Sequence, residues 1–95
     1  MDAELLFRKR MALSEKMFVE MVVWKVPEPL CASAHSFKYR LALVAHGICV
    51  LRYDNESGKG DHKHFGDDEV AYKFIDLKEL QADFWRDVEV WRSKQ

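Results

Sequence analysis

Apolar and polar side chains follow two different patterns along the first quarter of the chain. Residues 4–13 place apolar side chains on one side and mainly charged ones on the other, and this period of two predicts a half-buried strand. Residues 17–26 are apolar on both sides and rich in β-branched side chains, which is typical of a more central strand. With a turn at residues 14–16, the two segments predict a hairpin.

A second pair of strands is predicted after a loop that contains two prolines. Residues 27–36 form this loop, because proline removes a backbone donor and ends the preceding strand. Residues 37–45 and 48–54 have strand patterns, and the His-Gly pair at residues 46–47 favours a two-residue turn in which glycine accepts a positive φ. A fifth strand is expected within residues 61–75.

The last segment, residues 76–93, has the spacing of an amphipathic helix. Asp76 is a good N-cap, and Glu79 follows three residues later to complete a capping-box-like pair. One apolar stripe, which Trp85 widens, recurs at helical spacing and consists of Leu77, Leu80, Phe84, Val88 and Trp91. The whole pattern predicts an α+β fold over a single domain, residues 1–95: an antiparallel β-sheet of about five strands, built from hairpins and packed against one C-terminal α-helix.

Composition fits a packed cytoplasmic protein. The chain has 95 residues, of which 48% are hydrophobic and 13% aromatic, enough for one modest core. No apolar run approaches the roughly 20 residues that span a bilayer, and the acidic N-terminus differs from a signal peptide, so no membrane partner is expected. Cys31 and Cys49 lack metal-site spacing and are interpreted as structural thiols.

Charge is balanced overall but unevenly distributed. A net charge of −1 excludes a protein that binds nucleic acid through its bulk charge. Residues 35–64, however, carry five basic side chains against three acidic ones, together with all four histidines. A local basic patch on a nearly neutral chain indicates a small anionic target rather than a long duplex.

The richest chemistry lies in residues 52–64, beside a predicted strand. If residues 46–47 form a two-residue turn, residue 41 faces residue 52 and residue 39 faces residue 54. Four polar side chains would then share one face at the open end of this hairpin, namely Lys38, Arg40, Tyr53 and Asn55. A cluster on strands beside a glycine-containing loop is a suitable place for a site.

The loop Gly58-Lys59-Gly60 would let backbone amides approach an anion, with a lysine between the glycines. It does not match a Walker loop, which continues into Lys-Ser/Thr and a helix. A flexible turn is the alternative interpretation.

His62 and His64 are two residues apart, so on a strand they face the same side. Three roles remain open: acid–base catalysis near neutral pH, metal binding with Asp54 or Asp61, or ordinary surface histidines. Arg52, like Lys38 and Arg40, could hold a phosphate or stabilise a phosphoryl transition state. Pairing of these cations with nearby carboxylates is the alternative.

Several stretches of the chain match a known family. They are Ala3-Glu4-Leu5-Leu6 with Arg8, Val23-Trp24-Lys25-Val26-Pro27, Phe37-Lys38-Tyr39-Arg40-Leu41, the run from Arg52 to His64, and Leu80 to Trp91. In these stretches the chain resembles the TumE family of small bacterial proteins. The resemblance implies the toxin of a toxin–antitoxin pair, neutralised by a cognate antitoxin with a helix-turn-helix DNA-binding domain. Many small α+β toxins cut mRNA without a metal, and this analogy of fold class favours a similar activity here.

We therefore expect a type II toxin that acts on RNA as a metal-independent endoribonuclease, without a cofactor. The residues expected in catalysis are His62, His64, Lys59, Arg52 and Asp61. The residues expected to bind substrate are Lys38, Arg40, Tyr53, Asp54, Asn55, Gly58, Gly60 and Lys63. Two alternatives stay open: a non-catalytic binding module, and a metal-dependent nuclease that uses Asp54, Asp61, His62 and His64. A homodimer is a further candidate assembly.

Overall fold

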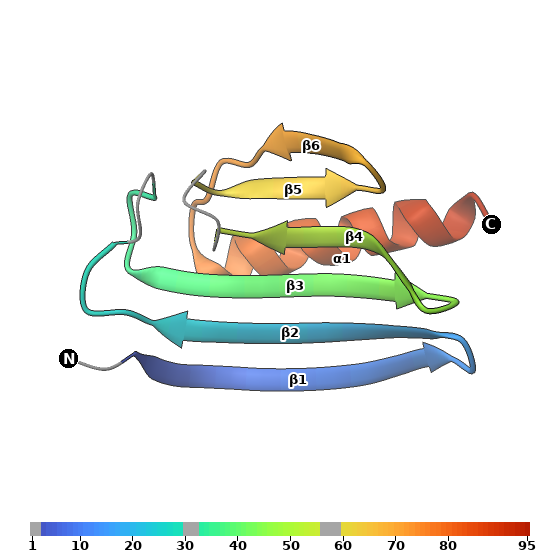
Figure 1. Cartoon of the computed structure of the whole chain (residues 1–95), viewed down its shortest axis with the longest axis horizontal. Coiled ribbons are helices and arrows are strands. Elements are labelled where there is room, and N and C mark those ends of the chain that lie inside the picture. Colours follow the sequence, from blue (N-terminus) through green and yellow to red (C-terminus); the bar gives the residue numbers. More distant parts are fainter. Residues whose placement is uncertain (1–2, 30–32, 56–59) are drawn as a thin grey trace.

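The computed structural model describes residues 3–29, 33–55 and 60–95. This part of the chain contains six antiparallel strands and one helix. The strands lie in one sheet in the order in which they follow along the chain, and the helix crosses one face (Figure 1). In chain order the elements are β1 (Glu4–Ser14), β2 (Met17–Lys25), β3 (Phe37–Ala45), β4 (Ile48–Asp54), β5 (His62–Phe65), β6 (Asp68–Ala71) and α1 (Leu77–Ser93). The predicted α+β architecture, with hairpin-built strands and a C-terminal helix, is confirmed.

Two-residue turns join β3 to β4 and β5 to β6. His46 and Gly47 have φ values of 53° and 77°, the pair of positive values that a type I′ turn requires, so the expected two-residue turn is confirmed. Gly66 has a φ of 59° and begins the turn between β5 and β6, whose second residue, Asp67, does not have a positive φ. This turn divides the expected fifth strand in residues 61–75 into two short ones, which gives the sheet a sixth strand.

The helix begins where its sequence predicts. The Asp76 side chain accepts a hydrogen bond of 2.7 Å from the backbone N–H of Glu79, as an N-cap should. Leu80, Phe84 and Val88 are fully buried and form the stripe that packs against the sheet. Because burying each large apolar side chain contributes roughly 1.5–3 kcal/mol, this stripe holds α1 to the sheet.

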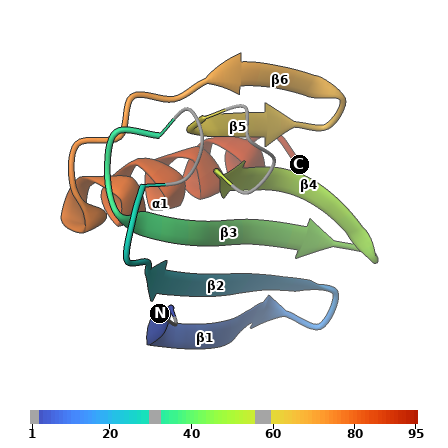
Figure 2. The ribbon, with the colours of Figure 1, turned by 60° about the vertical axis from the view of Figure 1, so that its left-hand side comes forward.

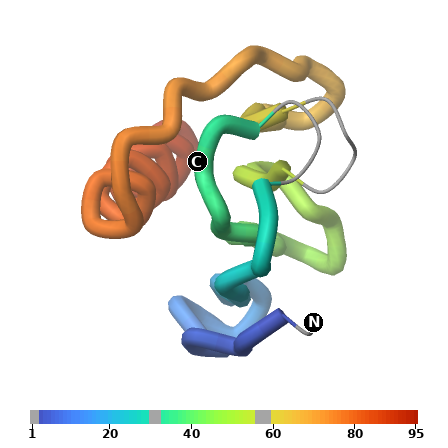
Figure 3. The backbone as a smooth tube through the Cα atoms, turned by 90° about the vertical axis from the view of Figure 1, so that its left-hand side faces the viewer, coloured from blue at the N-terminus to red at the C-terminus, as the bar shows by residue number. Residues whose placement is uncertain are grey.

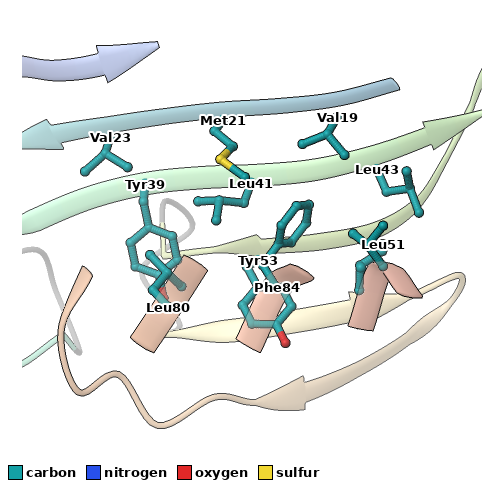
Figure 4. Packing of buried hydrophobic residues seen from close by; sticks show 11 residues of the cluster. Val19, Met21, Val23, Tyr39, Leu41, Leu43, Leu51, Tyr53, Leu80 and Phe84 are labelled. Carbon is teal, nitrogen blue, oxygen red and sulfur yellow. The ribbon is translucent and has the colours of Figure 1, made fainter. Parts of the chain in front are cut away.

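The hydrophobic core lies between α1 and the face of the sheet that β2, β3 and β4 present to it (Figure 4). Its buried members are Val19, Met21, Val23, Tyr39, Leu41, Leu43, Leu51, Tyr53, Leu80, Phe84 and Val88. Figures 2 and 3 show α1 on one side of the sheet only. Within the described residues, the opposite face of the sheet therefore has no helix over it, and we call it the open face.

A β-bulge in β4 changes the register that the turn alone would predict. Next to the turn the strands pair as expected, but Leu43 then pairs with Leu51, because Val50 is the extra residue. Beyond the bulge every partner is shifted by one position, so Tyr53 pairs with Leu41. The expected pairing of residue 41 with residue 52, and of residue 39 with residue 54, is wrong.

This shift separates four side chains that the sequence predicts on one face. Tyr53 points toward α1 and is fully buried, whereas Arg40 lies two positions from Lys38 on the open face. Asn55 is also fully buried. The predicted common face for Lys38, Arg40, Tyr53 and Asn55 is therefore wrong, since a shift of one residue moves a side chain to the other side of the sheet.

Two whole-chain features bear on the expectations from composition. Among the described residues, no helix is long and apolar enough to cross a membrane. Cys49 is a half-buried thiol without a disulfide in the described part of the chain, and Cys31 lies outside the described residues.

Candidate functional site

The open face carries two rows of side chains that run across all six described strands. Alternation along each strand sends the neighbours of buried Tyr53 away from α1, and strand pairing then fixes the rows. The first row contains Arg8, Val22, Arg40, Asp54, His62 and Ala71, and the second contains Arg10, Glu20, Ala42, Arg52, His64 and Glu69. Polar side chains of β4 and β5 meet at the centre of these rows.

Asp54, at the end of β4, joins the two rows. Its Oδ1 lies 2.8 Å from His62 Nε2, and its Oδ2 lies 2.7 Å from Arg52 Nε. Asp54 is 6% exposed and His62 is 4% exposed, so both are shielded from water. A buried carboxylate between a guanidinium and an imidazole is strongly held, because each partner offsets the cost of removing the charge from water.

The hydrogen bonds of His62 fix where its protons lie. Nδ1 is 2.8 Å from the carbonyl oxygen of Gly60, which can only accept, so Nδ1 donates. Nε2 faces Asp54 Oδ1, and a proton must lie between these two atoms for the contact to be favourable. The Asp54 carboxylate and the Gly60 carbonyl together therefore fix the orientation of the His62 ring.

His64, two residues further along β5, accepts a hydrogen bond with its Nε2 atom, unlike His62. Its Nε2 lies 3.1 Å from Arg52 Nη2, and since a guanidinium can only donate, Nε2 accepts and carries no proton. Partial burial, followed by the nearby Arg52 charge, lowers the pKa of His64 from its ordinary value of 6.5. The neutral imidazole of His64 therefore predominates at pH 7, and Glu69 Oε2 lies 3.6 Å from the same Nε2 atom that faces Arg52.

Arg52 connects the buried acid to the neutral base. Its guanidinium reaches Asp54 through Nε and His64 through Nη2. In the described part of the chain the Nε–H is not aligned with any acceptor, so the 2.7 Å contact with Asp54 is electrostatic rather than a well-directed hydrogen bond. The side chain is one-third exposed, which leaves part of this cation open to a ligand.

Further cations lie beside this centre on the open face. Arg40 on β3 is the direct partner of Asp54 on β4. Lys38 lies two residues before Arg40 on the same strand and is half-buried. A hollow of about 380 Å³ extends from Arg40 toward β1, where Arg8 and Arg10 line it. The open face therefore carries several arginines between β1 and β4, and Glu20 also lines the hollow.

Comparison with known proteins identifies the family of the chain. The family described as Toxin TumE matches residues 2–92, nearly the whole chain. The chain belongs to the TumE toxin family. Searches of curated proteins and of solved structures found no match. Membership of TumE confirms the resemblance drawn from the sequence and supports a toxin role.

Other residues expected at the site of this TumE protein lie on the α1 side of the sheet. Lys63 Nζ is 3.1 Å from Asp87 on α1, and the Tyr53 hydroxyl donates to the same carboxylate. Burial, and then this hydrogen bond, raise the pKa of Tyr53 far above its ordinary value. Both side chains hold α1 to β4 and β5, on the face opposite Arg52.

Asn55 acts as a clamp between β4 and β3. Its Oδ1 accepts from the backbone N–H of Tyr39 at 3.1 Å, and its Nδ2 donates to the carbonyl of Phe37 at 2.7 Å and to Ser33 Oγ at 3.3 Å. The side-chain amide thus makes hydrogen bonds to the β3 backbone just beyond the point where β4 ends. Asn55 supports the site by fixing the position of the neighbouring Asp54.

Asp61 belongs to a different cluster from His62. Its Oδ1 lies 2.7 Å from His35 Nε2 and 2.7 Å from the Tyr39 hydroxyl. His35 stacks on Phe74, with ring centroids 3.8 Å apart, and its Nδ1 accepts from a backbone N–H. Sequence reasoning treated His35 as a loop residue, and no local signal connects it with a carboxylate 26 positions away.

The glycine loop is only partly described. Gly60 has a φ of 82°, which suits glycine, and its carbonyl fixes His62. Gly58 and Lys59 lie outside the described residues. Sequence reasoning also missed Glu69, whose place beside His64 depends on the unexpected strand β6.

Proposed function

We propose that this member of the TumE family is the toxin of a type II toxin–antitoxin pair and cleaves RNA as a metal-independent endoribonuclease at Arg52 and His64. The observation that supports this most is the hydrogen bond from Arg52 Nη2 to an unprotonated His64 Nε2. It keeps a proton acceptor and a phosphate-binding cation side by side on a basic face.

In this proposal His64 is the general base. When the phosphate draws the Arg52 guanidinium toward itself, Nε2 of His64 is left to take the proton of a ribose 2′-hydroxyl. The 2′-oxygen then forms a bond to the adjacent phosphorus while the bond to the 5′-oxygen breaks, which gives a 2′,3′-cyclic phosphate and a 5′-hydroxyl. Arg52 and Arg40 offset the charge that develops on the phosphoryl oxygens.

The leaving 5′-oxygen must receive a proton, and we assign this task to Lys59 in the glycine loop. His62 is less suited to it, because its ring nitrogens already face Gly60 and Asp54. His62 and Asp54 are instead proposed to position Arg52, since their buried pair fixes the carboxylate that holds the guanidinium.

The remaining predicted residues have supporting roles in this proposal. Lys38 and Arg40 bind RNA phosphates along the open face. Gly58 and Gly60 let the loop approach the substrate. The residues that pack within the protein hold the site in shape, and these are Tyr53, Asn55, Asp61 and Lys63.

A cognate antitoxin with a helix-turn-helix domain is the proposed partner in the cytoplasm. Membership of a toxin family implies a neutralising antitoxin, and its helix-turn-helix domain is part of the proposal.

The test is cleavage of a defined mRNA by purified protein, with and without EDTA. His64→Asn should abolish cleavage, whereas His46→Asn should retain it, because His46 is an exposed turn residue whose positive φ asparagine tolerates. Cleavage products should end in a 2′,3′-cyclic phosphate. Activity that survives in His64→Asn would contradict the assignment of the base.

Two alternatives have specific support and give different results in this test. The cationic open face would also serve a non-catalytic RNA-binding module, which would bind RNA in a salt-dependent manner without cutting it. A metal-dependent nuclease would use Asp54, His62 and His64, which lie close together, and it would lose activity in EDTA. Asp61 is not part of that group because it lies with His35 and Tyr39.

A further inference from the structure

Three side chains on the open face have the geometry of an unassigned metal site. The ligand atoms of Asp54, His62 and His64 all lie within 4.8 Å of one another. Two imidazole nitrogens and one carboxylate oxygen suit zinc, cobalt or nickel rather than magnesium or calcium. A tetrahedral ion with bonds of about 2.0–2.1 Å needs ligand atoms about 3.3 Å apart, so small side-chain movements would close the site.

The surroundings of His62 resemble those of a metal ligand. Metal-binding histidines usually donate their other ring N–H to a carbonyl or carboxylate, which fixes the ring. His62 Nδ1 donates in this way to the Gly60 carbonyl at 2.8 Å, while Nε2 faces Asp54. The ring is thus already oriented with its second nitrogen toward Asp54, one of the other two ligands.

The guanidinium of Arg52 stands in the way of a metal ion. It lies 2.7 Å from Asp54 Oδ2, and its Nη2 donates to His64 Nε2 at 3.1 Å. The lone pair of Nε2 is the one that a metal ion would need, and a second positive charge at this place would be repelled. A metal ion and the present position of Arg52 therefore exclude each other.

We propose that Asp54, His62 and His64 form a transition-metal site that Arg52 blocks from within, so that binding of a divalent ion requires displacement of the guanidinium. The ion takes two nitrogens and one oxygen from the protein and completes its coordination with water. Arg52 acts as a built-in competitor, and its removal increases metal affinity.

One consequence rests on the proposed function. A bound ion removes the acceptor nitrogen of His64 and moves Arg52 away from it, which takes two groups out of metal-independent RNA cleavage. Zinc is therefore an inhibitor of the cleavage reaction rather than a cofactor for it.

The test is a Co²⁺ titration of the full chain without a histidine tag, followed by the visible absorption of the bound ion. Arg52→Met removes the competing charge, and Arg10→Met removes an equal charge from the same face three strands away, where Arg10 pairs with Glu20. Because changes around metal ligands typically alter affinity by about 10–100-fold, Arg52→Met should bind Co²⁺ at least about tenfold more tightly than Arg10→Met. Circular dichroism checks that each variant is folded, and Arg52→Gln replaces Arg52→Met if that variant is unfolded.

His64→Asn, added to Arg52→Met, should abolish the absorption of bound Co²⁺. Equal affinities in Arg52→Met and Arg10→Met would overturn the blocking role of Arg52. Absorption that persists after His64→Asn, or that never appears, would overturn the site itself. Zinc inhibition of RNA cleavage is measured separately, so a failure of that arm with intact Co²⁺ binding would count against the proposed ribonuclease and not against the metal site.

Discussion

Arg52 Nη2 donates a hydrogen bond to His64 Nε2 across β4 and β5. The two residues are direct partners in the sheet, so the contact depends on backbone register and not on a flexible loop. Arg52 also touches the buried carboxylate of Asp54. Arg52 is thus held by Asp54 and donates to the neutral His64. In the proposed reaction, its movement toward a phosphate would leave His64 free to accept a proton.

The first prediction concerns the pKa of His64. Burial, and then the Arg52 charge, lower the pKa below 6.5, so the neutral form of His64 should still predominate at pH 6.5. Arg52→Gln removes the second of these causes and should raise the pKa of His64 above its value in the unsubstituted protein. Histidine side-chain resonances followed by NMR against pH would measure both values.

The same shift predicts the pH dependence of the proposed RNA cleavage. A base with a lowered pKa keeps its acceptor form at lower pH, so the midpoint of the acidic decline in activity should lie below pH 6.5. A midpoint above pH 6.5 would show that another group limits the rate. An unchanged His64 pKa in Arg52→Gln would show that the guanidinium charge does not influence the base.

The second prediction concerns the buried pair of Asp54 and His62. Asp54→Ala leaves the His62 proton without its acceptor in a site shielded from water, and such loss of one partner of a buried pair typically costs about 3–5 kcal/mol. We expect urea unfolding to show a loss of this order. Asp67→Ala, which removes an exposed carboxylate at the β5–β6 turn, should change stability by less than about 0.5 kcal/mol. Equal effects of the two substitutions would contradict a structural role for the Asp54–His62 contact.

The third prediction concerns the Asn55 clamp. Asn55→Ala removes the acceptor of the Tyr39 N–H and the donor to the Phe37 carbonyl, and each buried group left without a partner costs about 1–3 kcal/mol. We expect a stability loss of about 2–4 kcal/mol, measured by urea unfolding. Gln95→Ala truncates an exposed amide at the end of the chain and should be close to neutral. If Asn55→Ala is equally neutral, water replaces the clamp and Asn55 has no structural role.

Much of the fold follows from local periodicity. The period of two in residues 4–13, the β-branched run in residues 17–26 and the capped helical stripe of α1 each correspond to an element in the structure. His62 and His64 share a face because positions two apart on any strand do so. These features depend on neighbours in the sequence, and the sequence therefore predicts them.

Contacts between distant residues were harder to predict. No glycine or proline marks the bulge at Val50, and yet it exchanges the faces of Tyr53 and Asp54 relative to β3. β6 is short and fully exposed, so it lacks the apolar alternation that identifies a strand. The contact between His35 and Asp61 depends on the packing of a loop and not on spacing.

The last prediction concerns the three tyrosines of the chain. Each donates its hydroxyl to an aspartate: Tyr39 to Asp61, Tyr53 to Asp87 and Tyr72 to Asp83. In each case burial is the largest cause that raises the tyrosine pKa above 10, and the hydrogen bond to the carboxylate is the second.

A group with a raised pKa in the folded state stabilises the fold below its unfolded pKa, and this contribution is lost as the pH rises above that value. We therefore expect stability to be constant up to about pH 10 and to fall steeply above it. Tyrosinate absorption should appear only together with unfolding, as followed by circular dichroism on the same samples.

Tyr72→Phe provides the matched control, because it keeps the ring that packs on Tyr53 and removes one hydroxyl. Between neutral and alkaline pH, Tyr72→Phe should lose less stability than the unsubstituted protein, because one tyrosine fewer ionises on unfolding. Reversible tyrosinate absorption near pH 10 in a protein that is still folded would show that at least one of these hydroxyls is open to water and not held by its aspartate.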